Sequence, residues 1–176
     1  MDATELMLAM SIPPARAQKW APALSLAMEA ANINNRRRQA AFLAQIGHES
    51  GSLVYVKELG GDKYFAKYDG RADLGNTQPG DGAKFAGRGL IQITGRANYA
   101  KASKALFGDD RLLKNPELLE QPEWAAKSAT WYWTTRNLNA LADQDRFTDI
   151  TKAINGGTNG LEDRKARYRL ALSVLL

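Results

Sequence analysis

The sequence predicts an α+β fold, predominantly helical, in one two-lobed domain with a small β-sheet beside a cleft. Apolar residues recur at helical spacing along most of the chain, and one short segment, 90–94, alternates as a β-strand does. With 176 residues, of which 44% are hydrophobic, the chain can bury one core, and it shows no repeat or linker. We therefore expect a single domain over residues 1–176.

The first long helix is predicted within segment 11–33, which opens with the helix-start signal Ser-Ile-Pro-Pro. Trp20, Leu24 and Met28 follow at helical spacing and predict one face against a core. Pro22 lies inside this pattern and is expected to kink or delay the helix.

The second helix is predicted over 36–49, after two asparagines that break the previous pattern. Phe42, Ile46 and Glu49 are spaced at i, i+4 and i+7, so they share one side of this helix. Glu49 is thus expected at the edge of the buried face, near the helix end. Further helices are predicted over 96–107, 122–135, 146–155 and 161–175, with a turn at 154–160.

Residues 59–89 are rich in glycine and aspartate and show no sustained period. Long ordered loops in compact domains are often functional, so this region is a candidate cleft wall. Leu90–Thr94 follows it, bounded by glycines, and is predicted to be the strand of the small sheet.

The residue composition excludes several kinds of chemistry. The chain has no cysteine, and its only histidine is His48, so disulfides, thiol catalysis, and cysteine- or histidine-rich metal sites are excluded. We expect no metal and no cofactor. The N-terminus starts acidic and predicts no signal peptide, and no apolar run approaches the roughly 18 residues of a membrane span. The net charge of +5 favours an anionic partner, which could be nucleic acid, lipid or cell wall.

Two glutamates nine positions apart, Glu49 and Glu58, form a candidate acid/base pair. Glutamate near a helix end is most often surface charge, but three features favour catalysis here. The helical face of Glu49 is apolar, Ser50-Gly51 ends the helix abruptly, and a glycine-rich region follows. Glu58 lies in a more polar segment beside Lys57, which suits an ionised base.

Three motifs resemble glycoside hydrolase family 19, which includes plant and bacterial chitinases: GHESG at 47–51, GRGLIQITGRANY at 87–99 and INGGTNG at 154–160. The resemblance covers nearly the whole chain and is greatest to single-domain phage and prophage endolysins. It implies a lysozyme-like fold without a separate wall-binding module. It also implies that Glu49 is the general acid, Glu58 the general base and Thr94 the hydroxyl that holds the attacking water.

The same resemblance implies roles for further residues. Substrate-binding candidates are Gln92, Asn98, Tyr99 and Asn155 along the sugar cleft, His48 as an orienting neighbour of Glu49, and Arg164 or Arg167 as support for the acidic pair. Plant chitinases have a considerably longer segment between the two glutamates. Because a loop can bring an aspartate round, the aspartates at 62, 69, 73 and 81 also remain possible bases.

Other motifs are assigned structural roles. The glycines around segment 90–94 match no phosphate-binding loop, because neither the Walker pattern nor the order strand, glycines, helix is met. The arginines at 36–38 and 164–169 are expected to lie on the solvated surface. Because no nucleic-acid-binding motif accompanies them, no nucleic-acid partner is expected. Trp131, Tyr132 and Trp133 are adjacent, so at least one is expected to be exposed or to line a groove.

We therefore expect a monomeric endolysin that hydrolyses β-1,4 glycosidic bonds of peptidoglycan glycan strands, with inversion. It would reside in the host cytoplasm before lysis and act on the periplasmic cell wall after release, without stable membrane insertion. A chitinase acting on GlcNAc polymers is the rival in the same class. A catalytically inactive wall-binding protein is the rival in another class.

Overall fold

The computed structural model describes all residues, 1–176, and consists almost entirely of helices joined by short turns. The α-helices are α1 (Ala3–Met10), α2 (Pro14–Ala30), α3 (Arg36–Glu49), α4 (Asp62–Phe65), α5 (Asp81–Lys84), α6 (Arg96–Phe107), α7 (Arg111–Lys114), α8 (Pro122–Thr135), α9 (Leu138–Asp143), α10 (Phe147–Asn155) and α11 (Leu161–Val174). Three 3-10 helices are η1 (Ala66–Tyr68), η2 (Ala72–Leu74) and η3 (Pro116–Glu120).

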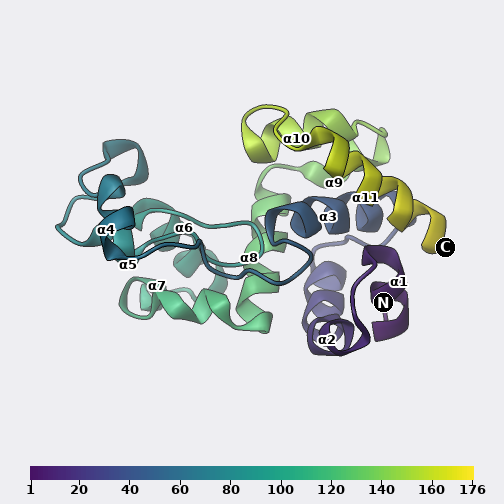
Figure 1. The fold of residues 1–176 in the computed structure, drawn as a ribbon, viewed down its shortest axis with the longest axis horizontal. Coiled ribbons are helices and arrows are strands. Elements are labelled where there is room, and N and C mark those ends of the chain that lie inside the picture. Colours follow the sequence, from purple (N-terminus) through teal and green to yellow (C-terminus); the bar gives the residue numbers. More distant parts are fainter.

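The helices form two groups with α8 between them (Figure 1). One group contains α1, α2, α3, α9, α10 and α11, in which α3 packs along α11 and α1 packs on both α2 and α11. The other group contains α4 to α7, with α6 packed on α7 and α5 packed on η1. Because α8 contacts both α2 and α6, it joins the two groups.

Helix α3 is the best-specified element of the chain. The side chain of Asn35 accepts a hydrogen bond from the backbone N–H of Arg38 and so caps the N-terminus, as asparagine commonly does. The buried face continues through Phe42 and Ile46, and the helix ends at Glu49 as predicted. Pro22, by contrast, does not interrupt α2, which runs continuously around it.

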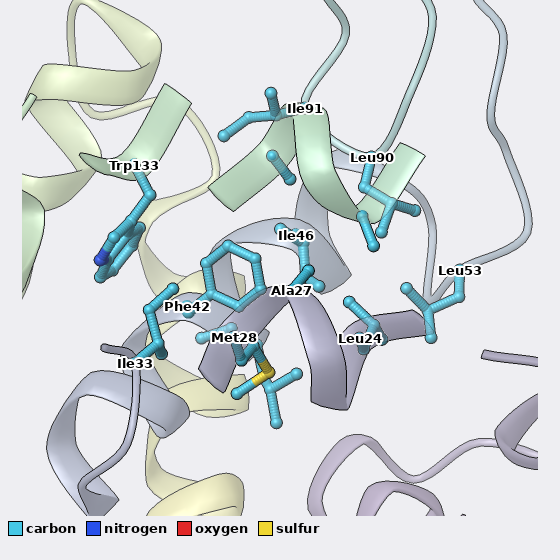
Figure 2. Close-up of a cluster of buried hydrophobic side chains, with 14 of the residues drawn as sticks. Leu24, Ala27, Met28, Ile33, Phe42, Ile46, Leu53, Leu90, Ile91 and Trp133 are labelled. Atoms are coloured by element: carbon cyan, nitrogen blue, oxygen red, sulfur yellow. The ribbon is translucent and has the colours of Figure 1, made fainter. Parts of the chain in front are cut away.

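A continuous hydrophobic core connects the segments that carry the candidate site. Figure 2 shows Leu24 of α2, Phe42 and Ile46 of α3, and Trp133 of α8 in one cluster with Leu90. The rings of Phe42 and Trp133 meet edge to face, with centroids 5.4 Å apart. The end of α3 and the turn near residue 90 are therefore anchored in the same core.

The predicted β-sheet is wrong. Residues 88–93 form a tight turn in which the backbone groups of Arg88 and Ile93 exchange both hydrogen bonds, and the only β-type pairings are isolated bridges. Gln92 has a left-handed backbone, with φ of 59°, which a strand cannot accommodate. Leu90, Ile91 and Ile93 are all buried, so the neighbours Leu90 and Ile91 face the core together, whereas adjacent side chains of a strand would point to opposite faces.

Several helices gave no clear signal in the sequence. Helices α1 and α9 were not predicted, and the region 59–89 contains α4, α5, η1 and η2 in place of an irregular loop. These elements are three to eight residues long, too short to show a helical period. None of the helices is both long enough and apolar enough to cross a lipid bilayer.

Candidate active site

Glu49, the proposed general acid, is the last residue of α3 and is held by Arg164 in the first turn of α11. Nη2 of Arg164 donates to Oε1 of Glu49 at 2.7 Å. The Arg164 side chain is 1% exposed and that of Glu49 is 21% exposed, so one partner is buried and the other reaches the surface. Oε2 of Glu49 accepts no hydrogen bond from the protein and is free to face a substrate.

Arg164 also belongs to a buried polar network that fixes its position. Its Nη1 donates to Oε1 of Gln45 at 2.6 Å, and its Nε donates to the carbonyl of Asn159 at 3.0 Å. Gln45 in turn donates to the hydroxyl of Thr151 at 2.9 Å. Since every donor group of the guanidinium has a partner, the group is locked in the geometry that holds Glu49. Sequence reasoning missed Gln45, which lies in the middle of an apolar run.

Arg167, the other arginine considered, has a different role. It donates to Asp163 at 2.8 Å and to the hydroxyl of Ser52 at 2.9 Å, and contacts neither proposed catalytic glutamate. The residues at 51–53 have consecutive left-handed backbones, with φ of 58°, 61° and 66°. Left-handed backbone is rare in residues other than glycine. Arg167 therefore stabilises the sharp turn that follows Glu49.

Glu58, the proposed general base, lies where the chain crosses to the second group of helices. Its backbone N–H donates to the carbonyl of Gly87 at 2.8 Å, and its Oε2 accepts a longer contact from the Gly87 N–H at 3.4 Å. Its Oε1 accepts from the hydroxyl of Tyr68 at 2.9 Å and, at 3.5 Å, from that of Tyr64. The carboxylate is thus held mainly through Oε1, with a weaker contact at Oε2.

Gln92 and Thr94 lie near Glu58, because all three residues pack against Gly87. A Cβ atom added at Gly87 would lie 2.6 Å from Oε1 of Gln92 and 3.1 Å from Oγ1 of Thr94, so both side chains lie against this glycine. The Thr94 hydroxyl donates to the carbonyl of Gln92 at 3.0 Å. Glu58, Gln92 and Thr94 therefore surround one backbone position, although the predicted strand does not exist.

Two other predicted cleft residues, Asn98 and Tyr99, make hydrogen bonds that hold the backbone near this turn. Asn98 donates to the carbonyl of Thr94 at 2.8 Å and is half-buried. The structure departs from the prediction at Tyr99, because its side chain is fully buried and cannot line a cleft. Its hydroxyl donates to the carbonyl of Ala86 and accepts from Arg88 at 3.1 Å. Burial also raises the pKa of Tyr99, so the hydroxyl remains a donor.

His48 and Asn155 lie in the group of helices that contains Glu49. Nδ1 of His48 pairs with Asp163 at 2.7 Å, and its ring packs against Gly160. Asn155 is exposed and accepts a hydrogen bond from the Asn159 N–H at 3.3 Å, which closes the turn after α10. Both residues brace the turn that carries the Asn159 carbonyl, an acceptor for Arg164.

Three of the alternative bases have structural partners. Asp69 accepts from the backbone N–H groups of Gly80 and Gly82, and Asp73 pairs with Arg71. Asp81 is buried and bound by both ends of the Arg96 guanidinium, which holds the pKa of the Asp81 carboxyl below its usual range. Only Asp62, which is exposed in the first turn of α4, has no side-chain partner.

The aromatic residues at 131–133 divide their roles. Trp133 is fully buried and donates to Asn139 at 2.8 Å, while Trp131 is partly exposed and lines a hollow between α8, α2 and α6. Tyr132 is partly buried and donates to the carbonyl of Ile154 at 3.3 Å. Burial raises its pKa, while the charge of Arg136 lowers it and that of Glu49 raises it.

Comparisons with known proteins agree on one enzyme family. The family model described as chitinase class I matches residues 16–145. A family 19 glycosyl hydrolase domain-containing protein of Haemophilus influenzae is 36% identical over 175 residues, which cover 84% of this chain and 84% of that protein. Acidic endochitinase SP2 of Beta vulgaris is 36% identical over 81% of this chain but only 49% of its own length. The chain thus spans about half of that plant relative.

Solved structures show the same fold. A bacterial family 19 chitinase superposes with a TM-score of 0.78 at 26% identity, over 98% of this chain and 93% of that chain. Chitinase C from Streptomyces griseus HUT6037 gives a TM-score of 0.76 at 27% identity, over 99% of this chain and 77% of that one. The fold is the predominantly helical, lysozyme-like fold of these enzymes. The chain therefore belongs to glycoside hydrolase family 19.

Proposed function

We propose that this protein hydrolyses β-1,4 glycosidic bonds of bacterial peptidoglycan by a single inverting displacement. Glu49 protonates the departing glycosidic oxygen, while Glu58 deprotonates a water molecule held by Thr94 and Gln92. The observation that carries this proposal is that Oε2 of Glu49 has no protein partner, while Oε2 of Glu58 accepts only a long hydrogen bond of 3.4 Å from the Gly87 N–H.

In the proposed acid, one carboxyl oxygen is hydrogen-bonded to the protein and the other is not. Arg164 binds Oε1 of Glu49, so the proton to be transferred would lie on Oε2, which has no protein partner. Arg164 also supplies a positive charge that stabilises the carboxylate left after proton transfer. The acid and its partner therefore need no rearrangement between the two protonation states.

The proposed base faces polar groups that can hold water. Oε2 of Glu58 lies on the Gly87 side, where the oxygen atoms of Gln92 and Thr94 also lie. A water molecule there would meet two acceptors and one hydroxyl, which suits a nucleophile that must lose a proton. Of the four aspartates considered as bases, three are held in structural interactions elsewhere.

Peptidoglycan is preferred over chitin as the substrate for two reasons. The net charge of +5 favours the anionic bacterial wall, whereas chitin is uncharged. The interval of nine positions between Glu49 and Glu58 also matches the short form of phage-type family members. The rival substrate is a GlcNAc polymer, because the plant and Streptomyces relatives carry the name chitinase.

The biological role follows from this substrate. We propose a monomeric endolysin of a phage or prophage that resides in the host cytoplasm and reaches the periplasmic wall at lysis. Peptidoglycan glycan strands would be its partner, with no nucleic acid and no stable membrane insertion. A catalytically inactive wall-binding protein would not require the ion pair that holds Glu49.

The substrate test compares purified Gram-negative sacculi with chitin hexasaccharide, using mass spectrometry of the released ends. A reducing muramic acid end supports a muramidase, and a reducing GlcNAc end supports a glucosaminidase. An anhydro end contradicts hydrolysis, and cleavage of chitin alone contradicts the proposed substrate.

The acid is tested by turbidity loss of outer-membrane-permeabilised cells. Glu49→Gln should clear them at least about 100-fold more slowly than wild type, because proton transfer to the leaving group is lost. Glu29→Gln, the same chemical change at an exposed residue of α2, is the matched control. A folded Glu49→Gln protein with wild-type clearing would refute the assignment.

A further inference from the structure

Tyr68 is a half-buried tyrosine whose hydroxyl donates to Oε1 of Glu58 at 2.9 Å. We infer that Tyr68 is a positioning residue for the base, an inference that rests on the proposed role of Glu58. By binding Oε1, it turns Oε2 toward Gly87, where Gln92 and Thr94 lie. No sequence pattern indicated Tyr68, because it lies in the region without a period.

The ring of Tyr68 is fixed from two sides. It lies beside the buried ring of Phe65, with centroids 6.5 Å apart and planes 25° from parallel. The backbone carbonyl of Tyr68 accepts a hydrogen bond from the side chain of Asn76 at 2.9 Å. Oδ1 of Asn76 in turn accepts from the backbone N–H of Arg96 at 2.8 Å. Asn76 is buried, so it ties η1 firmly to the start of α6.

The backbone under Tyr68 is equally constrained. The carboxylate of Asp69 accepts from the N–H groups of Gly80 at 3.2 Å and Gly82 at 2.6 Å. A side chain at Gly82 would overlap the carbonyl of Phe65 and the side chain of Asp69, the residues directly before and after η1, so α5 packs there as closely as a glycine allows. These contacts place the Tyr68 hydroxyl with the precision that a catalytic partner requires.

The chemistry of the hydroxyl suits a permanent donor. Burial, followed by the hydrogen bond to Glu58, raises the pKa of Tyr68, so its proton is retained at neutral pH. Lys67 lies over the Tyr68 ring, 4.9 Å from its centroid, and reinforces this position. Tyr68 therefore donates to Glu58 without competing for the proton of the water.

Tyr64 is the natural control, because it differs from Tyr68 in the features that matter. Its hydroxyl lies 3.5 Å from the same Oε1 of Glu58, at the limit of a hydrogen bond. Its side chain is 46% exposed, and Lys67 lies 3.6 Å from its ring centroid. Removing its hydroxyl should therefore leave Glu58 in place.

The test measures kcat and KM for Tyr68→Phe, Tyr64→Phe, Glu58→Gln and the Tyr68→Phe/Glu58→Gln double variant. It uses sacculi or chitin hexasaccharide, whichever the wild type cleaves. Tyr68→Phe should lower kcat by about 10- to 100-fold with KM within about 3-fold, because the base loses its alignment. Tyr64→Phe should stay within about 3-fold of wild type in both constants.

The double variant separates positioning from a general structural role. If Tyr68 acts through Glu58, Tyr68→Phe should change kcat by less than about 2-fold once Glu58 is glutamine. An equal loss in both backgrounds would overturn the inference, as would a rise in KM alone. A Glu58→Gln protein with wild-type kcat would instead refute the proposed base itself. Thermal unfolding of each variant shows whether lost activity reflects lost folding.

Discussion

Arg164 and Glu49 lie 115 positions apart in the sequence and are joined by a hydrogen bond of 2.7 Å. The contact exists because α11 packs along α3, which brings the first turn of one helix to the last turn of the other. An arginine that is 1% exposed is costly to bury unless its donors are all satisfied. Glu49, Gln45 and the Asn159 carbonyl satisfy them.

Replacing Arg164 by methionine should therefore reduce both stability and activity. The side chain of Gln45 and the carboxylate of Glu49 would lose their partner, at a cost of about 3 kcal/mol in the free energy of unfolding. Urea denaturation gives the stability, and sacculus hydrolysis gives the activity. Arg167→Met on the same helix is the control and should cost only about 1 kcal/mol, because both its partners, Asp163 and Ser52, reach the surface. Equal losses for both variants would contradict the special role of Arg164.

Thr94 should tolerate serine but not valine. Its hydroxyl lies against Gly87, and in the proposed mechanism it holds the attacking water. Thr94→Ser keeps this group and should retain kcat within about 3-fold, whereas Thr94→Val should lower kcat by about 10-fold or more. Steady-state kinetics on the cleaved substrate measure the difference. A fully active valine variant would show that the hydroxyl holds no catalytic water.

Gly82 and Gly80 form a matched pair for testing how tightly α5 packs. A methyl group at Gly82 would overlap the carbonyl of Phe65, while at Gly80 it would meet no atom within 4 Å. Gly80 has φ of 85°, so Gly80→Ala should cost about 1 kcal/mol of backbone strain. Gly82→Ala should cost about 3 kcal/mol or more. Thermal unfolding of both variants tests this order, and the reverse order would contradict the packing described.

The ion pair between Asp81 and Arg96 predicts a dependence of stability on pH. Its hydrogen bonds lower the pKa of Asp81 in the folded protein below the ordinary value of about 3.9. The pair therefore stabilises the fold above about pH 4, and this contribution is lost as the pH falls through the folded pKa.

Asp81→Asn should consequently be less stable than wild type at pH 7, by about 2 kcal/mol. The difference should shrink below about pH 4, where the wild-type carboxyl also becomes protonated. Urea denaturation at pH 7, 4 and 3 measures this. Asp110→Asn, at an exposed surface pair with Lys114, should show little difference at any pH. A constant difference for Asp81→Asn across this range would contradict the ion-pair account.

The sequence predicted the long helices from local patterns, and it named the candidate site residues largely through the resemblance to family 19. Helix α3 has its cap, its apolar stripe and Glu49 within one continuous segment. Glu58, Gln92 and Thr94 were predicted from the family motifs, and the structure brings them together around Gly87.

The predictions that were wrong or incomplete depended on contacts between distant segments. The segment around Gln92 has the alternation of a strand, but three apolar side chains, those of Leu90, Ile91 and Ile93, enter the core from one tight turn. Neither Arg164 nor Arg167 could be preferred until α11 was seen to pack on α3. Tyr68 became visible only when η1 was placed beside Glu58.

The left-handed turn at 51–53 gives the path between the two glutamates a defined shape. Ser52 is gripped by Arg167 and by Arg16, which donates to its carbonyl at 3.2 Å, and Leu53 is buried. The start of the segment that connects Glu49 to Glu58 is therefore fixed by contacts with two arginines and with the core. At the two ends of this segment, Arg164 holds the carboxylate of Glu49 and Tyr68 holds that of Glu58.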